Sequence, residues 1–155
     1  MNDKIKVLFV CLGNICRSPM AQFVFQQMVD EKGLSDQFEI NSAATESYNE
    51  MCHEGIYYGT RDILRAKHVP FEEHYSRRIR RADYEHYDYI LAMDDGNIED
   101  IQSIVGLDTE NKIHRLLDFT SNPRNIKDPW YTGNFEECYE DIVEGCRAFL
   151  ESLKL

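Results

Sequence analysis

The sequence predicts an α/β protein with a single domain, residues 1–155, in which parallel strands alternate with helices. The length fits one domain. Strand patterns and helix patterns alternate along the whole chain, which favours right-handed crossovers, a parallel sheet and helices on both of its faces. The first strand is continuously apolar from Val7 to Val10, as is typical of a strand that is buried on both faces.

The first strand and the first helix are the best-marked elements. The strand is expected at Lys4–Val10. The helix is expected at Ser18–Lys32, because Ser18 is a suitable N-cap, Pro19 suits the first helical position and Gly33 follows the last turn. The later elements of this half are a strand at 38–42, a polar loop at 43–53 and a helix at 55–67.

The second half of the chain contains two further strand patterns. The apolar segment Tyr87–Met93 predicts a third strand, and Ile113–Leu117 predicts a weaker fourth one, which His114 and Arg115 interrupt. In parallel sheets, ligands bind beyond the carboxyl ends of the strands, so residues that follow a strand are candidates for a site. The other expected elements are a short extended segment at 74–76, a helical turn at 82–86, helices at 94–105 and 135–153, and a long loop at 119–134.

Composition and charge narrow the class of protein. No stretch of about 18 apolar residues occurs, and the N-terminus lacks the apolar segment of a signal peptide, so we expect no membrane association. The formal net charge of −11 disfavours binding to nucleic acid or to an anionic membrane. The exception is the basic run Arg77–Arg81, which is either a solvated face or a basic rim that attracts an anionic substrate.

The five cysteines indicate reduced thiols rather than a disulfide framework. An odd number of cysteines without a secretion signal favours a cytoplasmic location. There is no Cys-x-x-Cys pair, and the neighbouring pair Cys52-His53 has no second pair at the spacing of a zinc site. We therefore expect no metal.

The segment Cys11–Ser18 joins the end of the first strand to the start of the first helix. In such a loop several backbone N–H groups are unpaired and, with the helix dipole, form a cradle for an anion. Gly13 and Asn14 most easily adopt the left-handed conformation that a tight cradle needs. Arg17 offers a planar guanidinium that can bind two oxygens of a tetrahedral oxyanion. The Gly-x-x-x-x-Gly-Lys pattern of a nucleotide loop is absent.

Cys11 is the candidate nucleophile of this loop. The amide dipoles, the Arg17 guanidinium and the helix N-terminus all stabilise a thiolate at the base of the cradle. Ser18 can donate a hydrogen bond to the sulfur. A thiolate beneath a bound phosphoryl group can attack the phosphorus in line. The loop has no carboxylate, which disfavours a magnesium-dependent phosphoryl transfer.

Such an attack also needs a proton for the leaving oxygen, and Asp128 is a candidate donor. Asp128 lies in the long loop after the fourth strand, and the following Pro129 favours an extended conformation of Asp128. Tyr48, Trp130 and Tyr131 are candidate walls of a pocket that a phenyl phosphate fills and a shorter phosphoserine does not. The alternative interpretations are an ordinary surface carboxylate and ordinary loop aromatics.

The segment CLGNICRSP resembles the active-site loop of the low-molecular-weight protein tyrosine phosphatases. Five further segments are similar and stand in family order: NSAAT, HYSRRI, DYILAMD, DPWYTG and CRAFLE. The resemblance implies a four-stranded parallel sheet of order 2-1-3-4. It also implies hydrolysis of phosphotyrosine in proteins through a cysteinyl-phosphate, without a cofactor. In that mechanism Cys11 is the nucleophile, Arg17 binds the phosphoryl oxygens and Asp128 is the general acid and base.

The resemblance implies binding and supporting roles as well. Ser42, Asn14 and His74 would support the loop by hydrogen bonding, which Asn14 in a strained conformation would need. Cys16 resembles a second loop cysteine that forms a reversible disulfide with Cys11, although a small buried side chain is the plainer interpretation. The family usually has a tyrosine where this chain has Trp130, so regulation by phosphorylation at that position is excluded. The expected substrate-binding residues are Leu12, Gly13, Asn14, Ile15, Cys16, Ser18, Tyr48, Trp130 and Tyr131.

Three alternative functions stand beside this one. An arsenate reductase of similar fold needs two further cysteines for its disulfide relay, and the span 53–137 contains none. A protein phosphoarginine phosphatase is the second alternative, but Ile15 suits a phenyl ring better than a guanidinium. A phosphate-binding module without turnover would need neither Cys11 nor Asp128. The expected partners are phosphotyrosine-containing proteins, and the chain itself is expected to be a monomer or a weak dimer.

Overall fold

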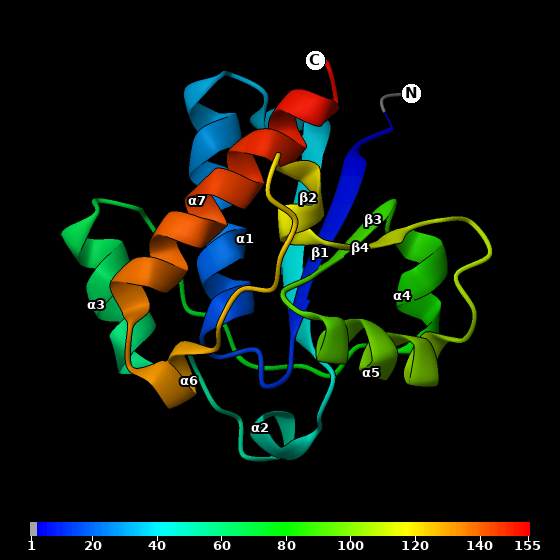
Figure 1. The fold of residues 1–155 in the computed structure, drawn as a ribbon, viewed down its shortest axis with the longest axis horizontal. Helices are drawn as coiled ribbons and strands as arrows, with labels where there is room; N and C mark the ends of the chain where they lie inside the picture. Colours follow the sequence, from blue (N-terminus) through cyan, green and yellow to red (C-terminus); the bar gives the residue numbers. More distant parts are fainter. Residues whose placement is uncertain (1–2) are drawn as a thin grey trace.

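The computed structural model describes residues 3–155, and its centre is a four-stranded, all-parallel sheet (Figure 1). The strands are β1 (Ile5–Cys11), β2 (Phe38–Ala44), β3 (Tyr89–Ala92) and β4 (Ile113–Arg115). Their order is β2-β1-β3-β4, so the predicted topology is confirmed. Because β2 and β3 lie on opposite sides of β1, the carboxyl end of β1 is the switch point at which such sheets bind ligands.

Helices cover both faces of the sheet, as predicted (Figure 1). Helices α1 (Arg17–Glu31), α3 (Tyr58–Ala66) and α7 (Phe135–Ser152) pack together on one face, and α4 (Arg81–His86) and α5 (Asp95–Val105) pack on the other. Alternate side chains of β1 enter the two cores: Val7 and Phe9 join the first, and Leu8 and Val10 join the second. This alternation is what a continuously apolar central strand produces.

Several element boundaries differ from the prediction. The first helix begins at Arg17 rather than Ser18, its N-cap is Cys16, and no side chain caps it, so the predicted N-cap role of Ser18 is wrong. The Ser18 side chain is buried and bonded within the loop, which removes it from the cap position. Two predicted loops contain short helices, and two 3-10 turns were not predicted: α2 (Tyr48–Met51), α6 (Pro129–Thr132), η1 (Ser35–Gln37) and η2 (Leu116–Phe119).

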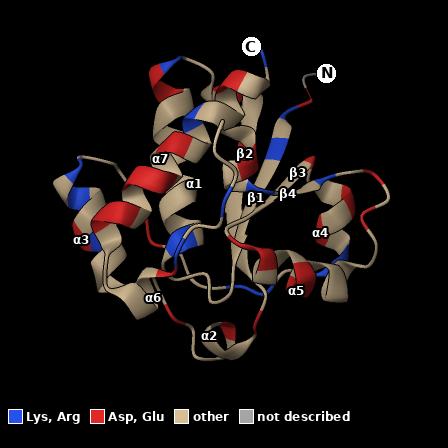
Figure 2. Ribbon diagram, in the orientation of Figure 1, with Lys and Arg blue, Asp and Glu red and all other residues tan. Residues whose placement is uncertain are grey.

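Two arginines of the basic run Arg77–Arg81 are held by ion pairs, and the run does not line the cavity of the site. Arg77 makes a bidentate ion pair with Asp83 at 3.0 and 3.1 Å, and Arg80 pairs with Glu50 at 3.1 Å. Within residues 3–155, none of the five lines the cavity described below. Figure 2 shows acidic residues distributed over α3, α4, α5 and α7, in keeping with the strongly negative net charge.

The described residues contain neither a membrane-spanning helix nor a cluster of metal ligands. None of the helices within residues 3–155 combines the length and the apolar character that crossing a membrane requires. In the same part of the chain, no three His, Cys, Asp or Glu side chains are grouped closely enough to hold a metal ion.

Candidate active site

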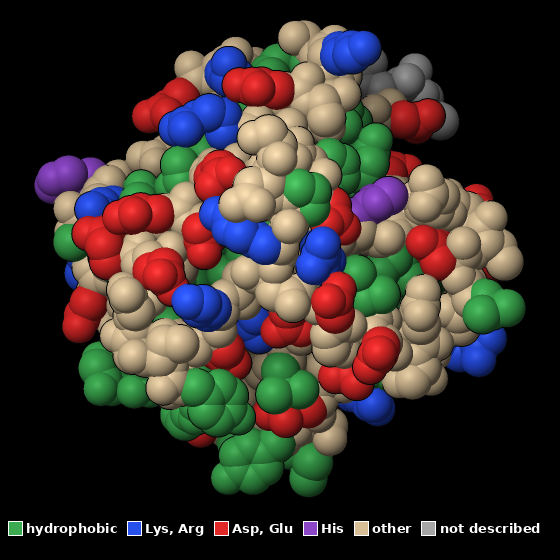
Figure 3. Space-filling model, in the orientation of Figure 1, with side chains coloured by type: hydrophobic (Ala, Val, Ile, Leu, Met, Phe, Trp, Pro, Cys, Tyr) green, Lys and Arg blue, Asp and Glu red, His purple; other side chains and the backbone are tan. Residues whose placement is uncertain are grey.

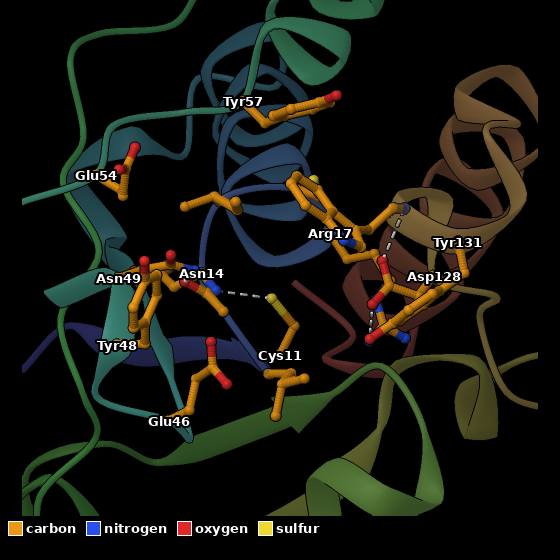
Figure 4. Close-up of a pocket in the computed structure, with 15 residues that line it drawn as sticks. Cys11, Asn14, Arg17, Glu46, Tyr48, Asn49, Glu54, Tyr57, Asp128 and Tyr131 are labelled. Carbon is orange, nitrogen blue, oxygen red and sulfur yellow. Dashed lines mark hydrogen bonds and ion pairs between the residues drawn. The ribbon is translucent and has the colours of Figure 1, made fainter. Parts of the chain in front are cut away.

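The loop between β1 and α1 forms the floor of a cavity of about 530 Å³ (Figure 4). Cys11 is the last residue of β1 and Arg17 is the first of α1, so the loop lies at the carboxyl end of the sheet, as predicted. The walls come from α2, from the residues before α3 and from α6. The predicted site residues that line the cavity are Cys11, Leu12, Gly13, Asn14, Ile15, Cys16, Arg17, Tyr48, Asp128, Trp130 and Tyr131.

The sulfur of Cys11 has two hydrogen-bonding partners within the loop. Its Sγ lies 3.0 Å from Oγ of Ser18, and the backbone N–H of Asn14 donates to it over 3.3 Å. The Ser18 hydroxyl already accepts a hydrogen bond from Nδ2 of Asn14 at 2.7 Å, so its own hydrogen is free to point at the sulfur. Ser18 is fully buried and is not among the residues that line the cavity, and its hydroxyl can donate to the Cys11 sulfur.

Asn14 adopts the left-handed conformation that a tight cradle requires, with φ of 57°. Its side chain makes four hydrogen bonds, which offset the strain of that conformation. Nδ2 donates to Ser18 Oγ and, over 3.0 Å, to Ser42 Oγ. Oδ1 accepts from Nε2 of His74 at 2.9 Å and from the backbone N–H of Arg77 at 3.3 Å. The structure thus brings Ser42 and His74 into contact with the loop.

The protonation state of His74 follows from these partners. An amide oxygen only accepts, so Nε2 of His74 carries the hydrogen. Ser42 Oγ, 3.1 Å from the same Nε2, gives its own hydrogen to Oε1 of Gln22 at 2.6 Å. Burial, together with the positive charge of Arg77, lowers the pKa of His74 from 6.5 to about 4. The ring is therefore a neutral donor at physiological pH.

Gly13 is needed for a different reason from the one predicted. It is not among the residues with positive φ, so the expectation of a left-handed conformation there is wrong. A Cβ atom at this position would lie 2.6 Å from Nδ2 of Asn49, and that same atom donates to the Gly13 carbonyl at 3.1 Å. The Ser76 hydroxyl donates to the same carbonyl at 2.9 Å. A side chain at Gly13 would therefore require the Asn49 amide to move and to give up its hydrogen bond to the loop.

Arg17 is buried and fixed by three acceptors. Its Nη1 donates to Oδ2 of Asp94 and to the carbonyl oxygen of Ile126, both at 2.7 Å, and its Nη2 lies 3.5 Å from Oδ2 of Asp128. Burial opposes the charged form, but the negative charges of Cys11, Asp128 and Asp94 outweigh it and raise the pKa of Arg17. The guanidinium is a permanent, oriented cation beside the thiol.

Asp128 lies across the cavity from the loop, next to Arg17 (Figure 4). It is the N-cap of α6, and its Oδ1 accepts from the backbone N–H of Trp130 at 3.0 Å. The following Pro129 occupies the first helical position, where its fixed φ suits a helix start. The sequence Asp-Pro-Trp therefore starts a short helix, and its N-cap position places the Asp128 carboxylate at the cavity.

Aromatic side chains form the upper walls of the cavity. Tyr48, Trp130 and Tyr131 are 66%, 54% and 78% exposed, so they stand at the mouth rather than in the core. Tyr57, which the sequence did not single out, lines the cavity and meets the Trp130 ring edge to face at 4.9 Å. Ile15 lines the cavity from the loop itself. The opening is flat-walled and mostly apolar above a polar, cationic floor.

Sequence reasoning missed several residues around the cavity. Asp94 had a signal, because only Met93 separates it from the end of β3, which places it at the same edge of the sheet as Cys11. Tyr57 had none, since its contact with the loop is a backbone hydrogen bond to the carbonyl of Ile15 at 2.9 Å. The other missed lining residues are Glu46, Asn49 and Glu54.

Cys16 lines the cavity but is a poor nucleophile. Burial is the main cause that raises its pKa to about 12, and the nearby Cys11 and Asp128 raise it further. All five cysteines are free thiols in the structure. Cys138 and Cys146 are buried in α7, where burial raises the pKa of each thiol, and Cys52 is exposed on a turn after α2.

Comparison with known proteins identifies the class. A family model described as low molecular weight phosphotyrosine protein phosphatase matches residues 6–155. Nearly the whole chain is covered by this match, so the protein is a phosphatase, an enzyme that hydrolyses phosphoric monoesters.

Individual relatives agree with the family match. The low molecular weight protein-tyrosine-phosphatase YfkJ of Bacillus subtilis is 40% identical over 154 residues, covering 97% of this chain and 96% of the relative. A low molecular weight phosphotyrosine protein phosphatase of Rattus norvegicus is 39% identical over 150 residues, covering 94% and 93%. The chain belongs to the low molecular weight phosphotyrosine protein phosphatase family.

Solved structures show the same fold. The crystal structure of Bacillus subtilis YfkJ superposes with a TM-score of 0.91 at 39% identity and covers 98% of this chain and 96% of its own. A drosophila arginine phosphatase superposes with a TM-score of 0.85 at 30% identity, covering 97% and 98%. Both comparisons extend over the whole described sheet and its helices.

Proposed function

We propose that this enzyme hydrolyses phosphotyrosine in proteins through a cysteinyl-phosphate intermediate. One observation carries the proposal: the Cys11 thiol lies at the floor of an aromatic-walled cavity into which Arg17 and Asp128 also project. A nucleophile, an anion clamp and a proton donor around one space are the parts that such a reaction needs.

In the first step the Cys11 thiolate attacks the phosphorus. A sulfur–phosphorus bond forms while the bond from phosphorus to the phenolic oxygen breaks, and Asp128 in its protonated form gives its proton to the leaving oxygen. Ser18 donates its hydrogen bond to the thiolate before attack. The backbone N–H groups of the loop and the Arg17 guanidinium bind the three equatorial oxygens.

In the second step water hydrolyses the cysteinyl-phosphate. Asp128, now ionised, takes a proton from the water while the water oxygen bonds to phosphorus, and the sulfur–phosphorus bond breaks to return the thiolate. Inorganic phosphate leaves, and Asp128 is again protonated for the next cycle. Arg17 keeps its place throughout, because Asp94 and the Ile126 carbonyl hold its Nη1 from the side away from the substrate.

Phosphotyrosine is the substrate that the cavity walls favour. Tyr48, Tyr57, Trp130 and Tyr131 offer flat faces for a phenyl ring, and Ile15 adds an apolar surface. The names of the relatives support the same choice, since YfkJ and the rat protein are both called phosphotyrosine or tyrosine phosphatases.

Phosphoarginine is the second candidate substrate. One neighbour in fold is an arginine phosphatase, and the carboxylates of Glu46 and Glu54 line the cavity, where they would attract a guanidinium. The aromatic walls and Ile15 weigh against it. A thiol-coupled arsenate reductase fits less well, because Cys138 and Cys146 are buried on the same helix and their thiols are held protonated.

The test assays wild type, Cys11→Ser and Asp128→Ala with phosphotyrosine, phosphoserine and phosphoarginine peptides in the presence of a chelator. We expect turnover of the phosphotyrosine peptide by wild type, none by Cys11→Ser, and a kcat about a hundredfold lower for Asp128→Ala. Retained turnover by Cys11→Ser would contradict the cysteinyl-phosphate. Preference for phosphoarginine would overturn the substrate assignment, and arsenate reduction coupled to a thiol donor would overturn the reaction.

Two further expectations accompany this function. The five cysteines are free thiols, as suits a reducing compartment, so we place the enzyme in the cytoplasm, which fractionation of its host cells would test. A monomer or a weak dimer remains the prediction for its assembly, and sedimentation over a range of concentrations measures it.

A further inference from the structure

A second hollow adjoins the catalytic cavity on the far side of one aromatic wall. We call it the α3–α6 groove: a cavity of about 560 Å³ lined by residues of α3, α6 and the start of α7, among them Tyr57, Tyr58, Asp62, Pro129, Trp130 and Phe135. Tyr57 and Trp130 line both the groove and the catalytic cavity. The two spaces are thus separated by the thickness of these two rings.

The groove is open to solvent, and its aromatic side chains are unusually exposed. Tyr58 is 67% exposed and Trp130 is 54% exposed. Figure 3 shows hydrophobic side chains gathered along the lower edge of this face, over α6 and α2. Exposed apolar surface that continues from an active site is typical of a surface that contacts the ligand.

The walls of the groove are held by packed aromatic rings. Tyr57 stacks on Phe135 with ring centroids 5.9 Å apart and meets Tyr58 at 4.4 Å. The Phe135 ring packs directly against Gly59, where an added Cβ atom would lie 2.5 Å from the ring. A preformed groove of this kind binds without first having to reorganise.

A single carboxylate, that of Asp62, gives the groove its charge among the described lining residues. Within residues 3–155, the ion pair of Asp62 is with Arg65 at 3.9 Å, between side chains that are 70% and 63% exposed. Such a pair is weak, and the Arg65 guanidinium also lies over the Phe71 ring at 5.4 Å. The Asp62 carboxylate is therefore open to a second cation.

Aromatic faces beside one carboxylate form a site for a cationic side chain. A guanidinium or an ammonium group gains from the π-face of a Tyr or Trp ring and from the carboxylate together. The net charge of −11 adds a long-range attraction for a cation and a repulsion for an acidic peptide. A basic residue next to the phosphate also offsets the repulsion between this acidic enzyme and a phosphorylated chain.

We propose that the α3–α6 groove binds the side chain of an Arg or Lys that flanks the phosphotyrosine in the substrate, so that the enzyme prefers basic phosphotyrosine sequences. This inference rests on the proposed function. Residues of an extended chain are spaced by about 3.3 Å, so the side chain one or two positions away reaches across the Tyr57–Trp130 wall while the phosphotyrosine fills the catalytic cavity.

The test measures kcat/KM for a series of phosphotyrosine peptides with Arg, Lys, Leu, Ala or Glu at the positions on either side. For wild type we expect the Arg and Lys peptides to exceed the Ala peptide by about three- to tenfold, and the Glu peptide to be the poorest. The ratio of Arg to Ala is the readout, because it is independent of the amount of folded enzyme. Hydrolysis of p-nitrophenyl phosphate, which has no flanking residues, reports the chemical step separately.

Variants assign the preference to the groove. In Asp62→Asn and in Tyr58→Ala the ratio of Arg to Ala is expected to fall towards one. The matched control is Asp100→Asn, which removes the same charge from an exposed position on α5. An equal fall in the control would show a general electrostatic effect and overturn the proposal, as would a wild-type ratio near one or a preference for Leu. If wild type hydrolyses no phosphotyrosine peptide, the proposed function fails and this inference falls with it; equal turnover of all the peptides refutes the groove alone.

Discussion

The ring Nε2 of His74 donates its hydrogen to Oδ1 of Asn14 across 2.9 Å, and this contact makes the histidine part of the hydrogen-bond network that supports the loop. The donor is a neutral ring, because burial and the charge of Arg77 lower the pKa of His74 to about 4. Protonation of the second ring nitrogen would place a positive charge on a largely buried ring near Arg77, which is unfavourable.

The first prediction concerns stability at low pH. Between about pH 6.5 and 4 the unfolded chain binds a proton at His74 and the folded chain does not, so the free energy of unfolding falls as the pH falls through this window and levels off below it. The largest loss from this group is about 3 kcal/mol. His74→Gln keeps an N–H donor and removes the titration, so its urea-unfolding profile is expected to be flatter. His68→Asn, at an exposed histidine, is the control and should follow wild type.

The second prediction separates strain from hydrogen bonding at Asn14. Asn14→Gly and Asn14→Ala both lose four side-chain hydrogen bonds, but only glycine adopts a φ of 57° without strain. We expect both variants to lose most of their activity and Asn14→Ala to be less stable than Asn14→Gly by about 1 kcal/mol. Urea titrations measure the difference. The usual order, in which alanine is the more stable residue, would show that the loop does not hold this conformation.

The third prediction concerns Asp94. In Asp94→Asn the amide oxygen can still accept from Asn97 N–H at the start of α5, as Oδ1 does over 2.8 Å, but the amide nitrogen cannot accept from Arg17. We expect kcat to fall by about tenfold or more, because Arg17 loses its orientation, while the thermal midpoint changes little. Asp95→Asn, at the neighbouring exposed carboxylate, is the matched control. An unchanged kcat in Asp94→Asn would show that the other acceptors suffice.

The fourth prediction concerns oxidation of the two loop thiols. We expect peroxide to oxidise the Cys11 thiolate to a sulfenic acid and the Cys16 thiol then to displace water and form a disulfide, slowly, because the raised pKa of Cys16 leaves little thiolate. Activity of wild type should return with dithiothreitol, whereas Cys16→Ser should be oxidised further and recover little. Cys52→Ser removes an exposed cysteine and should recover like wild type. Equal recovery of Cys16→Ser would exclude the protective disulfide, and mass spectrometry of the linked peptide provides a direct measurement.

The individual elements and the floor of the site were readable in the sequence because both are local, whereas the order of the strands came from the family resemblance. The strand Val7–Val10, the loop after it and the helix that follows are contiguous, so apolar patterning and loop chemistry place Cys11 and Arg17 together. The walls are not local. Tyr57 reaches the cavity through a backbone hydrogen bond to Ile15 and a ring contact with Trp130, and no periodicity encodes either contact.

The errors in the prediction have the same origin. Serine is a favoured residue type at an N-cap, but the Ser18 hydroxyl instead makes hydrogen bonds with Cys11 and Asn14. Gly13 was expected to supply backbone freedom, yet its φ is not positive, and a side chain there would first meet the amide of Asn49, which lies 36 residues further along the chain. Local propensity in both cases is overridden by a partner that only the fold brings near.

Asp128 caps α6, the helix that carries Trp130, so the proton that Asp128 gains and loses in the proposed cycle also affects a helix at the entrance of the cavity. In the proposed cycle the carboxyl group is neutral when substrate arrives and charged once the phenol has gained its proton. A charged carboxylate is the stronger acceptor and the better match for a helix start. If Asp128 acts as proposed, its cap on α6 is weaker in the free enzyme than in the cysteinyl-phosphate. The same proton would then control both the transfer to the leaving oxygen and the strength of the cap on α6.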